Sequence, residues 1–141
     1  MPTPGSVPSF ETALIVGAGA GLSASLARRL AKEGMKVALA SRTTGDLEGL
    51  VKETGAETFT CDASKPAEVA RLFADLDGSI GAPDIAIYNA SYRTRGPLVD
   101  IDPAEVEKSI MVSAYGGFLV AREAARRMLP RSMPRRFPTA R

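Results

Sequence analysis

Residues 12–34 read TALIVGAGAGLSASLARRLAKEG, and this stretch decides the fold. It begins with an apolar run, which is typical of a buried strand, and three glycines follow between Gly17 and Gly21. Leucines then recur at every fourth position from Leu22 to Leu30, as on one face of an amphipathic helix, and Gly34 is placed to end that helix. The stretch therefore predicts a strand, a tight turn and a helix, in that order.

The rest of the chain repeats this alternation of short apolar runs and helical periodicity. Asp102, Pro103 and Glu105 are spaced as at a helix N-terminus, and Ser64 is expected to cap an earlier helix. Strands that alternate with helices pair in parallel through right-handed crossovers, so about four strands and four helices predict an α/β fold with a doubly wound parallel sheet. The further strands are expected at residues 36–40, 57–62 and 84–88, and the further helices at 47–55, 64–76 and 102–128.

Length and composition limit the classes of protein. The 141 residues suit one globular domain, placed at residues 12–130 between a flexible N-terminal segment, 1–11, and a basic, disordered tail, 131–141. Seven arginines against one acid lie between residues 122 and 141, but no nucleic-acid-binding motif accompanies them, so nucleic acid is not an expected partner. The sequence shows no membrane-spanning run and no secretion signal, which predicts a cytoplasmic protein. One cysteine and no histidine argue against Cys/His metal sites and a histidine general base.

The glycine-rich turn predicts a binding site for a pyrophosphate. A turn that leads from the first strand into a helix leaves backbone N–H groups free at the positive end of the helix dipole. Gly17 would allow the sharp turn, and Gly19 and Gly21 would let the backbone approach the phosphates. A purely structural turn is the alternative, but its position in the first strand–helix unit favours nucleotide binding.

The same turn resembles the motif T-G-x-x-x-G-x-G of the short-chain dehydrogenase/reductase family. VGAGAGLS has Gly17 and Gly21 in place, whereas Val16 stands in the Thr position and Ser23 in the last Gly position. CDAS, YNAS and a pattern similar to V-N-x-x-G follow in the family's order, at residues 61–64, 88–91 and 112–116. The resemblance covers roughly residues 12–130. It implies a Rossmann-type domain of an oxidoreductase that transfers hydride between a nicotinamide cofactor and an alcohol or carbonyl substrate.

The resemblance also implies which residues contact the cofactor. The family's Asp after the third strand, here Asp62, bonds the adenine amino group. NAD-dependent members carry an acid at the end of the second strand, where this chain has Ser41 followed by Arg42. A hydroxyl and a guanidinium there favour NADP over NAD, because both can hold the 2′-phosphate. The full set of expected cofactor-binding residues is Gly17, Gly19, Gly21, Leu22, Ser41, Arg42, Asp62, Ala63, Asn89, Ala90 and Ser91.

Catalytic residues are not identified in this sequence. The resemblance implies a catalytic Ser and a Tyr-x-x-x-Lys pair on a fifth strand and helix that the sequence does not show, and Ser113 holds the position of the catalytic Asn. We therefore expect a truncated or frame-shifted product that binds a dinucleotide without turnover and self-associates through its last helix. The alternatives are a non-catalytic nucleotide-binding module and an S-adenosylmethionine-dependent methyltransferase. The methyltransferase is disfavoured because Ile15 and Val16 stand where that fold usually carries an acid. The substrate is not identified.

Overall fold

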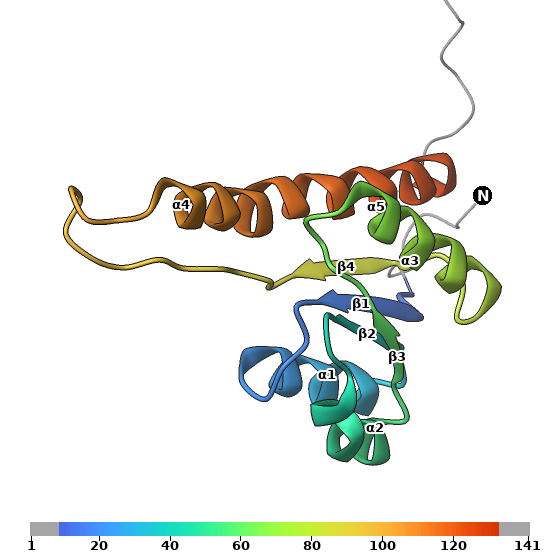
Figure 1. Ribbon diagram of the computed structural model, residues 1–141. Helices are drawn as coiled ribbons and strands as arrows, with labels where there is room; N and C mark the ends of the chain where they lie inside the picture. Colours follow the sequence, from blue (N-terminus) through green and yellow to red (C-terminus); the bar gives the residue numbers. More distant parts are fainter. Residues whose placement is uncertain (1–8, 133–141) are drawn as a thin grey trace, which may run out of the picture.

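The computed structural model describes residues 9–132 and contains one sheet of four parallel strands. The strands are β1 (Thr12–Val16), β2 (Lys36–Ser41), β3 (Glu57–Thr60) and β4 (Ile85–Tyr88), and their order in the sheet is β3-β2-β1-β4 (Figure 1). β1 lies between β2 and β4, so that Val16 is level with Ala40 on one side and with Tyr88 on the other. The predicted doubly wound parallel sheet is confirmed.

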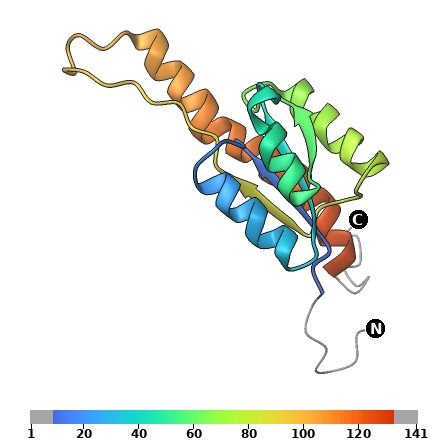
Figure 2. The same ribbon diagram turned by 90° about the horizontal axis from the view of Figure 1, so that it is seen from below.

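Helices cover both faces of the sheet (Figure 2). α1 (Leu22–Lys32) and α2 (Glu48–Thr54), the latter preceded by the 3-10 turn η1 (Gly45–Leu47), cover one face. α3 (Pro66–Gly78) and the helix formed by α4 (Pro103–Ile110), η2 (Met111–Tyr115) and α5 (Gly116–Ser132) lie on the other. Among residues 9–132, no helix has both the length and the apolarity that crossing a membrane would require.

The two helical layers give the sheet two apolar cores. All five residues of β1 are buried, as expected for a central parallel strand that is covered on both faces. Leu14 and Val16 belong to the core beneath α3 and α5, and Ile15 belongs to the core beneath α1 and α2. The alternation along β1 therefore ties the two layers together directly below the glycine-rich turn.

α1 ends as predicted, and two of its three predicted leucines pack against the core. Gly34 follows the helix with φ +84°, the left-handed conformation that a helix-ending glycine adopts. Leu26 and Leu30 are partly buried against the core beneath α1 and α2, as predicted, whereas Leu22 is 62% exposed, so the prediction is wrong for that residue. The buried residues of α1 are Ser23, Ala24 and Ala27. These side chains are small, which lets the helix lie close to the sheet.

The predicted cap of α3 is also wrong. Lys65, not Ser64, is the residue that precedes the helix, and no side chain caps its N-terminus. The backbone N–H and the hydroxyl of Ser64 both donate to Asp62 Oδ1, at 3.0 and 2.6 Å. A local turn of this kind competes with helix capping for the same hydroxyl group.

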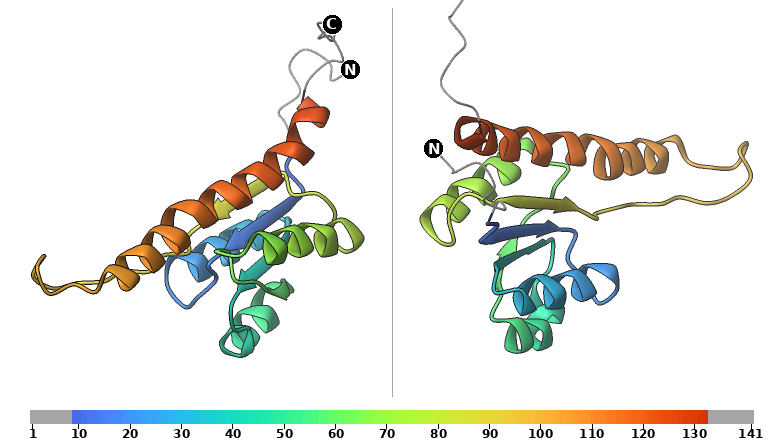
Figure 3. Two further views of the ribbon diagram at one scale, coloured as in Figure 1. Left: turned by 45° about the horizontal axis from the view of Figure 1, so that its top comes forward. Right: turned by 180° about the vertical axis from the view of Figure 1, so that it is seen from behind.

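α4, η2 and α5 form one continuous helix that lies along β4 (Figure 3). It begins as predicted, because the Asp102 carboxylate accepts a hydrogen bond of 2.9 Å from the backbone N–H of Ala104. Two features were not predicted. A π turn, η2, interrupts the helix, and the last turn continues beyond Met128 to Ser132.

The structure also bears on the edges of the predicted domain. Arg131 and Ser132 form the end of α5. Arg131 also forms an ion pair with Asp84. Asp84 accepts a further hydrogen bond, of 2.8 Å, from the backbone N–H of Glu11, next to the start of β1. The rest of the two predicted flanking segments, residues 1–8 and 133–141, lies outside the described residues.

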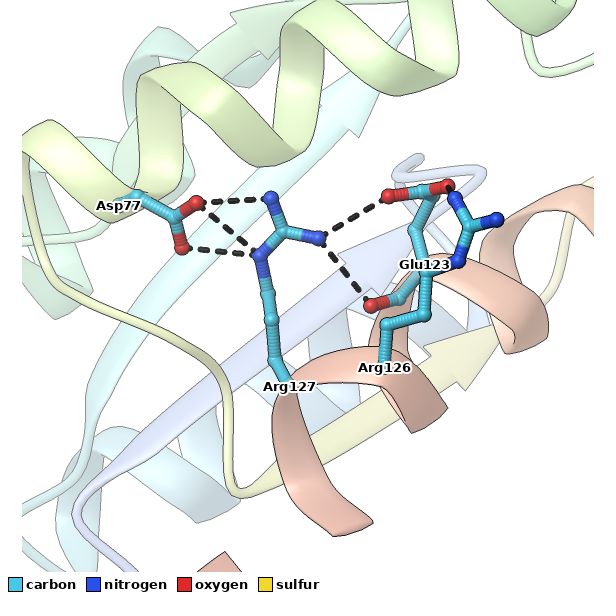
Figure 4. Close-up of polar contacts among 4 residues, drawn as sticks. All are labelled: Asp77, Glu123, Arg126 and Arg127. Carbon is cyan, nitrogen blue, oxygen red and sulfur yellow. Dashed lines mark hydrogen bonds and ion pairs between the residues drawn. The ribbon is translucent and has the colours of Figure 1, made fainter. Parts of the chain in front are cut away.

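α5 is fastened to α3 by one guanidinium group, that of Arg127 (Figure 4). Its Nε and Nη2 donate to Asp77 of α3 at 2.9 and 2.7 Å, and its Nη1 donates to Glu123 Oε2 at 3.0 Å. The same group lies 5.0 Å from the centre of the Phe73 ring. This contact joins the long helix to α3, beside the apolar packing of Leu119, Val120 and Ala124 against the same core.

Candidate functional site

A cleft of about 220 Å³ opens at the carboxyl ends of the four strands, the usual place for a ligand in a doubly wound fold. Eight of the eleven predicted site residues line it: Gly17, Ser41, Arg42, Asp62, Ala63, Asn89, Ala90 and Ser91. Gly19, Gly21 and Leu22 are not among the lining residues and lie in the turn that enters α1. The prediction missed five lining residues: Val16, Ala18, Cys61, Tyr92 and Val112.

Gly17 has a role in the fold as well as a place in the cleft. Its φ is +88°, and a Cβ at this position would lie 2.2 Å from the backbone nitrogen of Ala90. The N–H groups of Gly17 and Ala18 both donate to the carbonyl oxygen of Ala40, at 2.9 and 3.1 Å. These two N–H groups therefore point back to β2, and Gly17 is glycine because the end of β4 packs directly against it.

Gly19 and Gly21 have surroundings that differ from those of Gly17. A Cβ added at either position would meet no atom within 4 Å. Gly21 is the residue that precedes α1, and no side chain accepts from the N–H groups of the first helical turn. The exposed Leu22 begins that turn. Space and backbone donors thus coincide at the positive end of the helix dipole, an arrangement that suits an anion.

A buried hydroxyl joins the turn to the end of β4. Ser23 is 1% exposed, and its Oγ donates to the carbonyl oxygen of Gly17 at 2.9 Å. Ser23 Oγ in turn accepts a hydrogen bond of 2.9 Å from Asn89 Nδ2. The residue that stands in the family's last Gly position therefore connects two sides of the site. A hydroxyl residue at position 23 in the sequence could have indicated a hydrogen bond in the turn. The sequence alone, however, does not place Asn89 beside Ser23.

Ser41, Arg42 and Asp62 occupy neighbouring strand ends on the β3 side of the cleft. Hydrogen bonds from Ser64 lower the pKa of Asp62 against the effect of burial, and the charges of Lys65 and Arg42 lower it further. Asp62 is accordingly a carboxylate at neutral pH and an acceptor for N–H groups. The cleft thus combines one exposed guanidinium with one ionised carboxylate.

Tyr92 is held to the last helix by contacts from several residues. Its backbone N–H donates to Ser113 Oγ at 3.1 Å, and its carbonyl oxygen accepts from the hydroxyl groups of Ser113 and Ser109, at 3.2 and 2.7 Å. Lys108 Nζ lies 4.1 Å from the centre of the Tyr92 ring, and the phenol hydroxyl donates to Glu105. The ammonium thus faces the ring and the Glu105 carboxylate accepts the hydrogen bond of the hydroxyl, so this pair differs from a tyrosine whose hydroxyl contacts a lysine.

Cys61 directly follows β3 and lines the cleft. It is 2% exposed, and burial raises the pKa of its thiol to about 11, with the nearby Glu68 carboxylate adding to the increase. Since the thiolate is the reactive form, the thiol is a poor nucleophile at neutral pH. Cys61 therefore contributes to the shape of the cleft and is not a candidate nucleophile.

Two solved structures with the same architecture are a short-chain type dehydrogenase/reductase and a polyketide ketoreductase. A short-chain type dehydrogenase/reductase from Mycobacterium marinum has a TM-score of 0.81 and 29% identity, covering 86% of this chain and 51% of that one. A variant of actinorhodin polyketide ketoreductase, solved with NADPH, has a TM-score of 0.81 and 28% identity, covering 86% of this chain and 49% of that one.

The sequence comparisons agree with the structural ones. The chain is 33% identical over 130 residues to the short chain dehydrogenase/reductase nsrJ of Aspergillus novofumigatus, covering 88% of this chain and 49% of that protein. It spans about half the length of the curated relatives that it matches. The sequence model of the short chain dehydrogenase family matches residues 11–135. The chain therefore belongs to the short-chain dehydrogenase family.

Proposed function

We propose that the cleft binds NADP(H) and that the chain is the cofactor-binding part of an oxidoreductase acting on an alcohol or carbonyl compound. The observation that carries this proposal is the open space around Gly19 and Gly21 at the uncapped start of α1. A pyrophosphate placed there would meet backbone N–H groups and a favourable helix dipole. The bound cofactor would supply the hydride that such an enzyme transfers.

The remaining residues of the cleft fit the other parts of the dinucleotide. Asp62 and Ala63 would hold the adenine, with the ionised carboxylate accepting from its amino group. Arg42, which is exposed at the cleft, would pair with the 2′-phosphate beside Ser41. Asn89, Ala90 and Ser91 would lie along the rest of the cofactor. The similar ketoreductase was solved with NADPH, which supports the choice of a dinucleotide but not by itself the choice of NADP for this chain.

We propose further that these 141 residues bind the cofactor without turnover. Reduction of a carbonyl needs a positioned proton donor, and general acid–base catalysis contributes roughly 10²–10⁴-fold to such reactions. The sequence has no histidine and no tyrosine with a lysine four residues later, and Ser113 is bonded to the Tyr92 backbone. In assays with a panel of aldehydes, ketones and quinones, the absorbance of the reduced nicotinamide should therefore stay constant. Substrate-dependent oxidation of NADPH by the purified chain would contradict this proposal.

Two other functions remain as alternatives to the oxidoreductase. A non-catalytic nucleotide-binding module would bind the same cofactor, and an S-adenosylmethionine-dependent methyltransferase would bind a different one. Ile15 and Val16 are fully buried in β1, which leaves no acid at the position where a methyltransferase usually carries one. Calorimetric titration with NADPH, NADH and S-adenosylmethionine separates the methyltransferase from the dinucleotide-binding functions.

The substitution Gly21→Val tests the proposed cofactor site directly. Because a Cβ there meets no protein atom within 4 Å, the variant should keep the helical circular-dichroism signal of the wild type. The added side chain would enter the space of the pyrophosphate, so NADPH binding measured by calorimetry should be lost. Gly49→Val in α2 is the matched control, since its Cβ also meets nothing within 4 Å and the residue lies in a different helix from the glycine-rich turn. Unchanged NADPH affinity in Gly21→Val would show that the turn is only structural.

A further inference from the structure

Tyr88, the last residue of β4, does not line the cleft but contacts a residue that does. Its hydroxyl donates to the carbonyl oxygen of Val112, a cleft-lining residue in the π turn η2. The Tyr88 ring is partly buried and packs against the core beneath α3 and α5. Burial raises the pKa of the Tyr88 phenol, so the hydroxyl keeps its proton and remains a donor at neutral pH.

The long helix is shaped around this phenol ring. A Cβ at the buried residue Gly116 would lie 2.3 Å from Tyr88 Oη and 2.8 Å from the carbonyl oxygen of Ala63. A Cβ at Gly117 would lie 3.4 Å from Tyr88 Cδ1. Glycine at position 116 therefore lets the helix, the Tyr88 hydroxyl and the backbone of Ala63 meet at one point. Ala63 is itself a cleft-lining residue, as is Val112.

The Tyr88 hydroxyl contacts the part of the helix in which the hydrogen-bond spacing changes. In η2 the backbone N–H of Gly116 bonds the carbonyl oxygen of Met111, a spacing of five residues. A π turn is wider than an α-helical turn and is seldom stable without a specific contact. A side-chain donor on the carbonyl oxygen of Val112 supplies such a contact and holds Val112 at the cleft.

We propose that Tyr88 is a positioning residue that sets the separation of Val112 and Ala63, and with it the shape of the end of the cleft that receives the adenine half of the cofactor. The proposal rests on the proposed function for the identity of the ligand. Tyr88 does not line the cleft, so it acts through Val112 and through the close approach of Gly116 to Ala63.

The test compares Tyr88→Phe with Tyr115→Phe. Tyr115 lies in the same π turn and packs against the same core, which makes it a matched control for the loss of a phenol hydroxyl. Hydrogen exchange of residues 111–117, measured by mass spectrometry without ligand, should be faster in Tyr88→Phe than in the control. Titration with 2′,5′-ADP, the adenine half of NADP, should show weaker affinity in Tyr88→Phe, by up to about tenfold if binding must restore all that the lost Tyr88–Val112 hydrogen bond contributed.

The two measurements separate this proposal from the proposed function. Both are made at a temperature at which circular dichroism shows all variants to be folded, so that a general loss of stability does not change the affinity. Equal exchange in the two variants, or equal affinity for 2′,5′-ADP, would overturn the role of Tyr88. If the wild-type chain does not bind 2′,5′-ADP, the proposed function fails, and the exchange of residues 111–117 still decides whether Tyr88 holds the π turn.

Discussion

Replacing Arg127 with alanine should destabilise the fold by about 2–3 kcal/mol. Hydrogen bonds to charged groups contribute roughly 1.5–3 kcal/mol, whereas exposed ion pairs contribute about 0–1 kcal/mol. Glu123 is 17% exposed and Arg127 21%, so their bond belongs to the stronger class; Asp77 is 46% exposed, so its pair must be discounted for solvent screening. The contact with the Phe73 ring adds about 0.5 kcal/mol.

Urea unfolding at pH 7 measures this loss. Arg126→Ala is the matched control, because Arg126 bonds the same Glu123 at 2.7 Å but is 55% exposed (Figure 4). We expect the control to lose less than about 1 kcal/mol of unfolding free energy. A loss in Arg127→Ala that is no larger than in Arg126→Ala would refute the reasoning, because burial would then not strengthen the contact.

The effect of Arg127 should also depend on pH. The hydrogen bond from Arg127 and then its charge lower the pKa of Asp77, while burial opposes them. A carboxyl whose folded pKa lies below its unfolded pKa, about 3.9, stabilises the fold fully above that value and loses this contribution as the pH falls through the folded pKa. The Asp77 part of the difference between wild type and Arg127→Ala should therefore shrink below about pH 4. A difference that is constant from pH 7 into the acid range would contradict the assignment to Asp77.

Two further predictions concern the cleft. Arg42→Ala should weaken NADPH binding by about tenfold or more and NADH binding hardly at all, as measured by calorimetry, because only NADPH carries the 2′-phosphate; equal losses would reject that role for Arg42. Gly17→Ala should lower the unfolding free energy by at least about 1–3 kcal/mol, because its φ is +88° and its Cβ would lie 2.2 Å from Ala90 N. Gly19→Ala, which meets nothing within 4 Å, should change it by less than about 0.5 kcal/mol. Similar values for the two substitutions would mean that the turn can relax.

Local patterns were sufficient to predict most of the helices and strands. The apolar run of β1, the Asp102 cap and Gly34 depend on neighbouring residues alone, and all three were predicted correctly. The eight predicted residues that line the cleft came from the glycine-rich turn and from the family resemblance, and they lie together because strand ends meet at one edge of a parallel sheet. Which ligand these residues bind remains a prediction, since a position in the lining of the cleft does not identify the ligand.

Features that depend on tertiary contacts could not be predicted. The π turn η2 contacts Tyr88 of β4 through the carbonyl oxygen of Val112. The periodicity of the helix sequence carries no information about this contact with a strand. Ser64 has the right chemistry for a cap, but its hydroxyl and its backbone N–H both donate to Asp62 instead. Leucine at position 22 fits the spacing of a packed face, yet the close approach of α1 to the sheet is made through smaller side chains. In each case the outcome depended on surroundings that the spacing of residues along the helix does not describe.

The hydrogen bonds from Asn89 to Ser23 and from Ser23 to Gly17 have a consequence for the order of folding. Asn89 and Ser23 are 66 positions apart in the chain, so a large loop must close before these bonds can form. A nascent chain in which only β1, α1 and β2 have assembled would contain the glycine-rich turn without the backbone of Asn89 and Ala90 that packs against it. A ligand of the complete cleft would bind only after β4 has joined β1, and mass action would then draw partly assembled chains towards the four-stranded sheet.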